Sequence, residues 1–187
     1  MVVGFAFCGS FCTIGKCVDA LEKLKETGVD INPVMSETVF NTDNRFNKAS
    51  ELIEKVENIC GNKVLHTITM TEPIGPKKLL DALIIAPCTG NTISKIANGV
   101  TDSSVTMAAK AHLRNQRPLI VAISTNDGLS NSAKNIGMLL NMKNVYFVPF
   151  GQDDAFNKKT SLVADMDKIN ETLKCALKGE QIQPILL

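Results

Sequence analysis

The sequence Ala86-Pro87-Cys88-Thr89-Gly90-Asn91-Thr92 marks the point from which the fold of this chain can be predicted. The uninterrupted apolar run 82–86 precedes it, and residues 93–98 follow with a helix-like pattern. Such an apolar run is typical of a strand that is buried on both faces of a parallel sheet. The change to Thr, Gly and Asn predicts that the strand ends here and that a helix begins. Backbone amides and small hydroxyl groups gather at such a junction, which makes it a favourable place for a ligand.

Strand-like and helix-like segments alternate about five times along the chain, which favours a doubly wound, mainly parallel α/β sheet flanked by helices. Strands are predicted at 2–7, 31–35, 63–69, 82–86, 118–123 and 145–149, with a turn at 151–154. Helices are predicted around 18–28 and at 46–59, 77–81, 93–98, 105–115, 132–141 and 161–178. Asn44 is the expected cap of the second helix, Pro76 the expected start of the third, and 101–104 a capping cluster. Since no linker, repeat or low-complexity tract interrupts the 187 residues, we expect one domain over residues 1–187.

The composition excludes several classes of partner. The formal net charge is +1, which gives no electrostatic basis for binding nucleic acid or an anionic membrane. No apolar run approaches the ~20 residues of a membrane span. Residues 1–7 lack the basic start of a signal peptide and are predicted as a strand. These features together predict a cytoplasmic protein.

The six cysteines are expected to be free thiols, as is usual in a reducing compartment. The spacing of Cys8, Cys12 and Cys17 invites a zinc interpretation, but no second Cys or His pair follows at zinc-site spacing. The sequence therefore favours small residues that line a loop and a helix, and it predicts no metal site.

Polar and small residues follow four of the predicted strands, at Gly9-Ser10, Ser36–Thr38, Thr89–Thr92 and Ser124–Asp127. In a doubly wound sheet the carboxyl ends of the strands meet at one edge. Four such ends together predict a site for a phosphorylated, partly planar ligand. The chain lacks the GxGxxG fingerprint, which favours a mononucleotide over a dinucleotide.

The stretch 86–92, followed by ISKIANGVTD at 93–102, resembles the Pro-Ala-Ser-Ala-Asn-Thr motif of the flavoprotein family. That family includes flavin-containing cysteine decarboxylases, phosphopantothenoylcysteine decarboxylase and flavin prenyltransferases. The resemblance covers about residues 2–150 and implies an FMN cofactor in a Rossmann-like fold. It places the phosphate near Gly9, Ser10, Phe11 and Ser36. It places the isoalloxazine near Thr89, Gly90, Asn91 and Thr92, with Ser104 or Thr106 nearby.

Four segments resemble more narrowly one branch of the family: EPIGPK at 72–77, PCTGNT at 87–92, MAAKAHLRN at 107–115 and VPFGQDD at 148–154. Members of this branch serve as one component of an oxidoreductase that makes an aromatic pyridine dicarboxylate in the mother cell of spore-forming bacteria. The resemblance implies a partner subunit that binds NAD(P), a small dicarboxylate substrate and a homo-oligomer. Lys77, Lys110 and Arg114 are candidate cations for the substrate's carboxylates.

Catalytic residues are less well indicated, and His66, Asn91 and Asn126 are the candidates. The family's decarboxylases carry a catalytic His shortly before the strand that leads into the motif, and His66 does not match that position cleanly. His112 is expected on a helix surface. The decarboxylases' Pro-Ala-Met-Asn element corresponds to 124–127, where only Asn126 is kept. Two alternatives stay open: a stand-alone FMN-dependent decarboxylase, and a non-catalytic partner of the dinucleotide-binding subunit.

Overall fold

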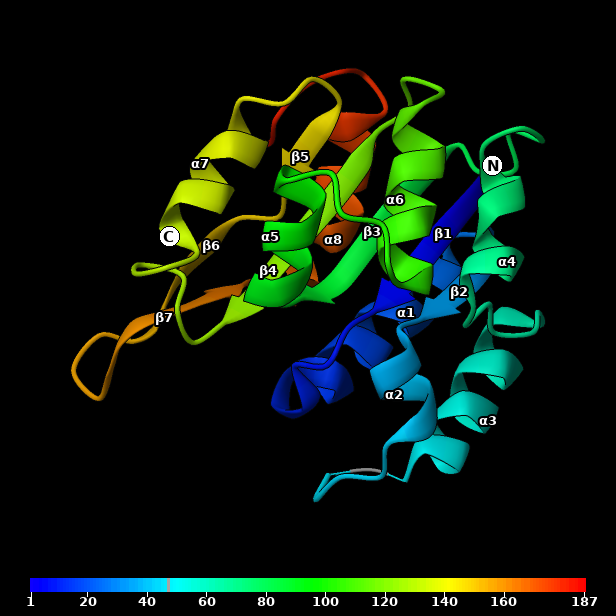
Figure 1. Cartoon of the computed structure of the whole chain (residues 1–187), viewed down its shortest axis with the longest axis horizontal. Coiled ribbons are helices and arrows are strands. Elements are labelled where there is room, and N and C mark those ends of the chain that lie inside the picture. The colour runs from blue at the N-terminus through cyan, green and yellow to red at the C-terminus, as the bar shows by residue number, and fades with distance from the viewer. Residues whose placement is uncertain (47) are drawn as a thin grey trace.

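A computed structural model describes residues 1–46 and 48–187 of the chain. Its central strand is β3 (Ala82–Cys88), all of whose residues are buried. In the sheet, β3 lies between β1 (Val2–Phe7) and β4 (Leu119–Thr125), β2 (Asp30–Met35) lies beyond β1, and β5 (Val145–Phe147) pairs with β4 (Figure 1). These pairings are all parallel, which confirms the predicted sheet. The apolar runs of the sequence are these strands because both faces of the sheet are covered.

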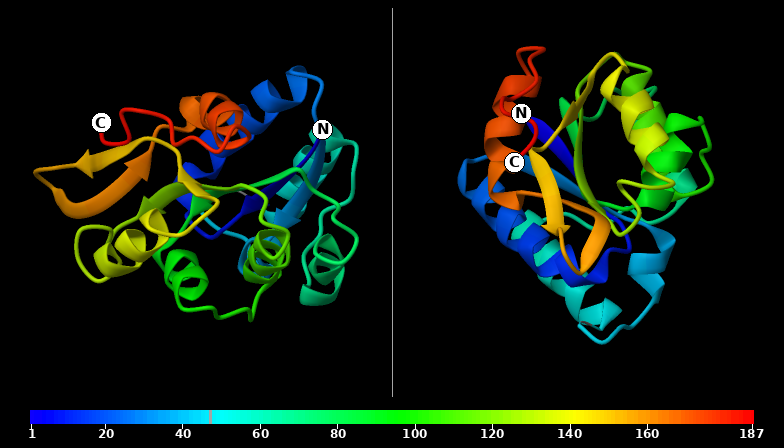
Figure 2. Two further views of the ribbon diagram at one scale, coloured as in Figure 1. Left: turned by 90° about the horizontal axis from the view of Figure 1, so that it is seen from above. Right: turned by 90° about the vertical axis from the view of Figure 1, so that its left-hand side faces the viewer.

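Helices pack on both faces of the sheet (Figure 2). One layer contains α1 (Ile14–Glu26), α3 (Ala49–Cys60) and α8 (Ile169–Ala176). The other contains α4 (Ile68–Thr71), α5 (Gly90–Ala97), α6 (Ser104–Leu113) and α7 (Ala133–Leu140). The remaining helical elements are short: α2 (Glu37–Asn41) and the 3-10 turns Phe11–Thr13, Glu72–Ile74 and Met166–Lys168. The core lies between these layers, where Phe5, Ile84 and Val121 are fully buried.

Hydroxyl side chains cap the N-termini of α2, α5 and α6. The Ser36 side chain accepts a hydrogen bond from the Val39 N–H at the start of α2, and Thr89 accepts one from Thr92 at the start of α5. Ser103 caps α6 in a capping box with Thr106, as the cluster 101–104 predicted. Side chains at these positions satisfy N–H groups that the first turn of a helix leaves without partners.

The main departure from the sequence-based fold is a β-hairpin near the C-terminus. Residues 151–154 were expected as a turn and 161–178 as a helix, but β6 (Phe150–Asp154) and β7 (Lys158–Ala164) form an antiparallel pair. The end of β4 pairs with β7, so Ser124 lies opposite Val163. This long-range pairing satisfies the backbone of 158–164, and no local pattern reveals it. The helix expected from residue 161 therefore begins only at Ile169.

Smaller differences lie between β2 and β3. The expected strand 63–69 is reduced to one bridge between Leu65 and Val34, because Thr67 caps α4 immediately afterwards. The expected helix 77–81 is absent: a 3-10 turn, Glu72–Ile74, takes Pro73 in its first turn, and Lys78 has φ of 50°. The expected helix 46–59 begins at Ala49 and ends at Cys60. Its first N–H is bonded by Asp43 rather than by Asn44, and the expected range includes residue 47, which lies outside the described residues.

Over the described ranges, none of the helices has the length and apolar character that crossing a membrane requires.

Candidate functional site

The four polar strand ends meet at the carboxyl edge of the sheet, where two cavities open side by side. The larger is about 750 Å³ and the smaller about 500 Å³, both within the range of small-molecule sites. Gly9 and Thr89 line both cavities. Ser10, Phe11 and Asn126 line only the larger, and Ser36, Asn91 and Thr92 line only the smaller. The structure thus brings most of the predicted site residues together, divided between two adjoining spaces.

A cluster of hydroxyl groups joins the ends of β1 and β4 in the larger cavity. The Ser10 Oγ lies 2.8 Å from the Ser124 Oγ, and the Thr13 Oγ1 lies 2.7 Å from the same atom. Ser124 is buried, so these hydrogen bonds replace the water it would otherwise contact. The cluster holds the loop after β1 against the end of β4. All three residues line the larger cavity, where a hydroxyl can both donate and accept a hydrogen bond.

Cations and aromatic rings complete the larger cavity. Lys16, Arg45 and Lys158 line it, with the Arg45 guanidinium 4.7 Å from the centroid of the Phe46 ring. Lys158 also forms an ion pair with Asp153, its neighbour across the hairpin. Sequence reasoning missed these cations as site residues. Lys158 belongs to the hairpin that was not predicted, and no pattern in the sequence distinguishes Lys16 or Arg45 from other surface cations.

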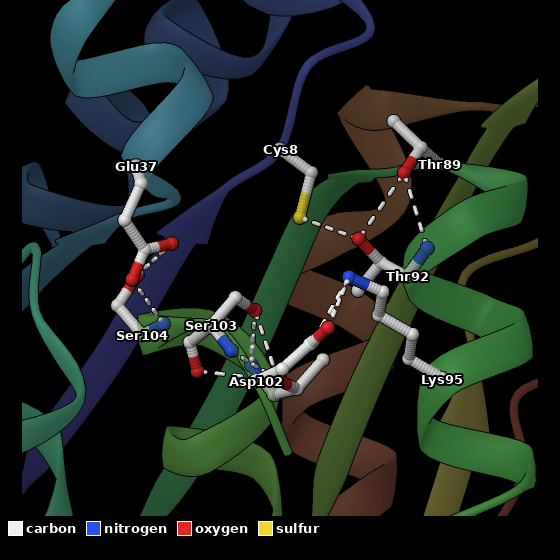
Figure 3. Close-up of polar contacts among 9 residues, drawn as sticks. Cys8, Glu37, Thr89, Thr92, Lys95, Asp102, Ser103 and Ser104 are labelled. Carbon is white, nitrogen blue, oxygen red and sulfur yellow. Dashed lines mark hydrogen bonds and ion pairs between the residues drawn. The ribbon is translucent and has the colours of Figure 1, made fainter. Parts of the chain in front are cut away.

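A chain of hydrogen bonds connects the opening motif to the thiol of Cys8 (Figure 3). The Thr89 hydroxyl donates to the Thr92 Oγ1 at 3.1 Å, and the Thr92 hydroxyl donates to the Cys8 Sγ at 3.3 Å. Burial raises the pKa of the Cys8 thiol to about 11, against the lowering effect of the Thr92 hydrogen bond. Cys8 is therefore a protonated thiol near neutral pH, and it acts as a packing and hydrogen-bonding group rather than as a nucleophile.

The smaller cavity carries charged groups on opposite walls (Figure 3). Lys95, on α5, forms an ion pair with Asp102. Glu37, at the start of α2, accepts a hydrogen bond from the Ser104 N–H at 2.9 Å. Glu37 thereby ties the first turn of α6 to the end of β2. Glu37, Lys95 and Asp102 all lie in stretches that were named from the sequence, but no role in the site was predicted for any of these charges.

Three predicted cofactor contacts have other positions. Ser104 and Thr106 line neither cavity: Ser104 Oγ donates to the Met35 carbonyl at 2.6 Å, and Thr106 is used in the capping box. Ser103 lines the smaller cavity instead. Gly90 also lines neither cavity, because its Cα faces the side chains of Asp127, Ser132 and Thr125 behind the motif.

Neither histidine lines either cavity. His66 stacks on the Phe40 ring, with 3.6 Å between centroids, and lines neither cavity, whereas Asn91 and Asn126 each line one. His112 was expected on a helix surface, but it is fully buried, with its Nε2 3.0 Å from the Pro118 carbonyl oxygen. Burial lowers the pKa of His112 to about 4. The side chain packs between α6 and the start of β4, which the helical position alone does not reveal.

The cations proposed for a dicarboxylate also lie elsewhere. Lys77, Lys110 and Arg114 are exposed and line neither cavity. All six cysteines are free, and the residues 1–46 and 48–187 contain no group of His, Cys, Asp and Glu side chains that could hold a metal ion. Of the three cysteines in the 8–17 spacing, Cys8 and Cys17 are buried in the core and Cys12 is exposed.

Comparison with known proteins places this geometry in a family. The chain is 44% identical over 185 residues to the B subunit of dipicolinate synthase from Bacillus subtilis (strain 168), covering 99% of this chain and 92% of that protein. The crystal structure of the corresponding B subunit from Bacillus halodurans C has a TM-score of 0.92 and 46% identity, covering 100% of this chain and 95% of that one.

More distant structures share the fold alone. A dodecameric FMN-dependent UbiX-like decarboxylase from Escherichia coli O157:H7 has a TM-score of 0.65 at 21% identity, over 80% of each chain. The flavoprotein family model matches residues 1–177, which span the parallel sheet, both cavities and the hairpin. Because this match takes in the sheet edge and the capping residues described above, the chain belongs to the flavoprotein family.

Proposed function

We propose that this chain is the B subunit of a dipicolinate-forming enzyme and takes part in the oxidation of dihydrodipicolinate to dipicolinate. The observation that carries the proposal is similarity along the whole chain to a dipicolinate synthase B subunit, with both cavities inside the matched region. The reaction removes a hydride and a proton from the dihydropyridine ring, and NAD(P)+ accepts the hydride. The enzyme works in the cytoplasm of a spore-forming cell.

The dinucleotide belongs to a partner, the A subunit. The loop after β1 reads Cys8-Gly9-Ser10-Phe11-Cys12-Thr13 and lacks the glycine fingerprint that seats a pyrophosphate. A protein with this loop suits a mononucleotide. We therefore assign the dinucleotide to the A subunit and a flavin site to this chain.

The residues at the sheet edge fit FMN. The larger cavity offers the Ser10–Thr13–Ser124 hydroxyls and the cations Lys16 and Arg45, which suit a phosphate dianion. Phe11 and Thr89 provide an apolar and a small polar wall for a flat ring. A bound flavin supplies reversible acceptance of a hydride equivalent. The side chains of this chain bind and orient the cofactor and substrate, and the hydrogen-bonded Cys8–Thr92 pair lies in the wall of the smaller cavity next to it.

A homo-oligomer is also proposed. The E. coli relative is described as dodecameric and FMN-dependent, which supports assembly and flavin use in proteins of this fold.

Two measurements test the proposal. The first is the absorption spectrum of the purified chain after incubation with FMN and removal of free flavin, with a band near 450 nm expected. The second is formation of dipicolinate from dihydrodipicolinate and NAD(P)+, with the A subunit alone and with both subunits. We expect the pair to exceed the A subunit alone. Equal rates of dipicolinate formation with and without this chain would refute its catalytic role. If this chain stays colourless after incubation with FMN but still raises the rate, it is a non-catalytic partner of the A subunit.

The alternative of a stand-alone decarboxylase is less favoured. Such an enzyme needs a histidine beside the flavin, as the resemblance implies, whereas His66 stacks on Phe40 and lines neither cavity. A His66→Ala variant that loses flavin-dependent decarboxylation of a cysteine-derived carboxylate would revive this alternative.

A further inference from the structure

The β6–β7 hairpin concentrates exposed apolar side chains at one end of the molecule. Among the described residues, five large apolar side chains are more than half exposed, and one of them is Met1. The other four lie on the hairpin or beside it: Leu129 at 51%, Phe156 at 87%, Leu186 at 67% and Leu187 at 66%. Figure 2 shows the hairpin projecting from the body of the molecule, with the C-terminal residues beside it. Such a concentration is typical of an interaction site, whereas apolar residues exposed singly are not.

Backbone hydrogen bonds hold the flanking residues against the hairpin. The Leu129 N–H donates to the Thr160 carbonyl of β7 at 2.9 Å. On the other edge of the hairpin, the Leu187 N–H donates to the Phe150 carbonyl of β6 at 3.0 Å. The exposure of these apolar side chains therefore belongs to the folded hairpin.

The turn of the hairpin presents Phe156 in a restricted geometry. The Asp154 carboxylate accepts hydrogen bonds from the Phe156 N–H at 3.1 Å and the Asn157 N–H at 3.0 Å. The side-chain amide of Asn157 donates to the other carboxylate oxygen at 2.8 Å. An Asp side chain that binds the backbone of its own turn limits the conformations of that turn. A partner that takes up the Phe156 ring therefore pays less conformational entropy for ordering it.

One cation of the hairpin is available to a partner. Lys158 pairs with Asp153, and Asp154 binds the turn. Lys159 is exposed, and within residues 1–46 and 48–187 no carboxylate forms an ion pair with it. The exposed apolar side chains and this cation are complementary to a partner face that offers an apolar pocket and a carboxylate.

The hairpin is also one wall of the larger cavity. The residues that line the cavity from the hairpin are Asp153, Lys158, Ser161, Leu162 and Val163. A protein that binds the hairpin therefore lies next to the cavity proposed for FMN. Hydride transfer to NAD(P)+ needs the nicotinamide within about 3–3.5 Å of the hydride donor. The subunit that holds the dinucleotide must therefore bind beside this cavity, which favours the A subunit over a second copy of this chain as the partner.

We propose that the hairpin surface, formed by Leu129, Phe156, Lys159, Leu186 and Leu187, is the docking surface for the dinucleotide-binding A subunit. Phe156 enters an apolar pocket of that subunit, and Lys159 faces one of its carboxylates. The A subunit comes from the proposed function above, on which this inference rests.

The affinity of the purified chain for the purified A subunit tests this docking surface. Titration calorimetry compares wild type with Phe156→Ser and Lys159→Glu. We expect Phe156→Ser to raise Kd by about tenfold or more, the scale of burying one Phe side chain at an interface. Lys159→Glu should raise Kd roughly two- to fivefold at low salt and less at high salt, because salt screens exposed charges.

The matched controls lie on α7, which lines neither cavity. Met138→Ser and Lys134→Glu change an exposed apolar residue and an exposed cation of that helix, and both variants should bind the A subunit as wild type does. Thermal unfolding should give the wild-type Tm for Phe156→Ser, because so exposed a ring packs little within the chain. An unchanged Kd in Phe156→Ser, or an equal rise in Met138→Ser, would overturn the docking surface.

Sedimentation of the chain alone distinguishes the A subunit from a second copy. Phe156→Ser should keep the oligomeric state of wild type. If that variant instead dissociates a homo-oligomer and binds the A subunit with wild-type affinity, the hairpin is a contact between copies of this chain and the proposal is wrong.

Failure of this inference is distinct from failure of the proposed function. If the two subunits together make dipicolinate while Phe156→Ser leaves Kd unchanged, the A subunit docks elsewhere and only this inference falls. An A subunit that does not bind wild type at all would also overturn it. If the pair makes no more dipicolinate than the A subunit alone, the proposed function falls. Binding of the A subunit that depends on Phe156 would in that case still support the docking surface.

Discussion

Gly90 and Asp127 are in direct contact behind the ligand-facing side of the central motif. A Cβ on Gly90 would lie 2.5 Å from the Asp127 Oδ1, and 2.6 Å from both the Ser132 Oγ and the Thr125 Oγ1. The carboxylate accepts hydrogen bonds from both hydroxyls, at 2.9 Å from Ser132 and 2.5 Å from Thr125. It lies at the N-terminus of α5, where a negative charge is favourable. The absence of a side chain at residue 90 therefore lets the loop after β4 fix the start of α5.

Gly90→Ala should destabilise the protein despite the better helix propensity of Ala. The added methyl group must displace a hydrogen-bonded network, and overpacking of this kind costs about 1–3 kcal/mol. Urea denaturation measures the change. Gly137→Ala is the matched control, because Gly137 is in α7 with nothing within 4 Å of its added Cβ. That control should gain up to about 1 kcal/mol. Asp127→Ala in the Gly90→Ala background should recover part of the loss, and strictly additive losses would show that the contact does not cause the effect.

Ser124→Ala should weaken FMN binding if the larger cavity holds the phosphate. Removing this hydroxyl breaks the contacts with both Ser10 and Thr13, so the loop after β1 loses its attachment to β4. Two lost hydrogen bonds predict a rise in Kd of about tenfold, measured by flavin fluorescence. Ser50→Ala, at an exposed position on α3, should leave Kd unchanged. An unaltered Kd in the Ser124 variant would remove this cluster from the flavin site.

FMN should protect Cys12 from thiol reagents. Cys12 is exposed and lines the larger cavity, whereas Cys175, on α8, lines neither cavity. Labelling at pH 8, followed by mass spectrometry of peptides, should show slower modification of Cys12 with FMN and an unchanged rate at Cys175. Cys8 should stay unmodified in the folded protein, because burial raises its pKa to about 11 and little thiolate is present. Equal protection of both thiols, or of neither, would argue against cofactor binding in this cavity.

His112 should make the protein less stable in acid. Its pKa is lowered from 6.5 to about 4 because burial disfavours the charged ring, so the unfolded chain binds a proton more readily than the folded chain. The stabilisation is complete above pH 6.5 and is lost as pH falls towards 4. The full shift corresponds to roughly 3 kcal/mol. Urea unfolding of His112→Gln at pH 7 and pH 4.5 should show a smaller drop than wild type.

The matched control is His66→Gln, at the other histidine of the chain. It should keep the wild-type drop in stability between the two pH values. A His112 variant that loses as much stability in acid as wild type would assign acid sensitivity to the carboxylates instead.

The parallel sheet was predictable because short-range residue patterns specify its strands. The runs 2–7, 82–86 and 118–123 are apolar without alternation, and each ends in small polar residues, so strand, junction and sheet type follow from neighbouring residues alone. The meeting of the polar strand ends at one edge was predictable to the same extent. Ser10, Ser36, Thr89 and Asn126 each follow a predicted strand, and parallel topology brings such ends together.

The hairpin was not predictable, because residues 158–164 become a strand only through pairing with β4 and β6. The same holds for the charged groups of the site. Lys158 lines the larger cavity from that hairpin. Lys95 differs from other lysines of the chain in that it lines the smaller cavity, which the sequence does not reveal. His112, expected on a surface, is buried by the packing of α6 on the sheet.

The sequence by itself thus determined the strand-to-helix junction at 86–92, the order of the parallel units and the family resemblance, since these depend on short-range pattern. Tertiary structure alone decided that the edge divides into two cavities, which cations line each, and that Gly90 must leave room for Asp127. These features depend on contacts between side chains of β1, β4, α5 and the hairpin. The residues in contact are far apart in the sequence, so no short-range pattern predicts the contacts.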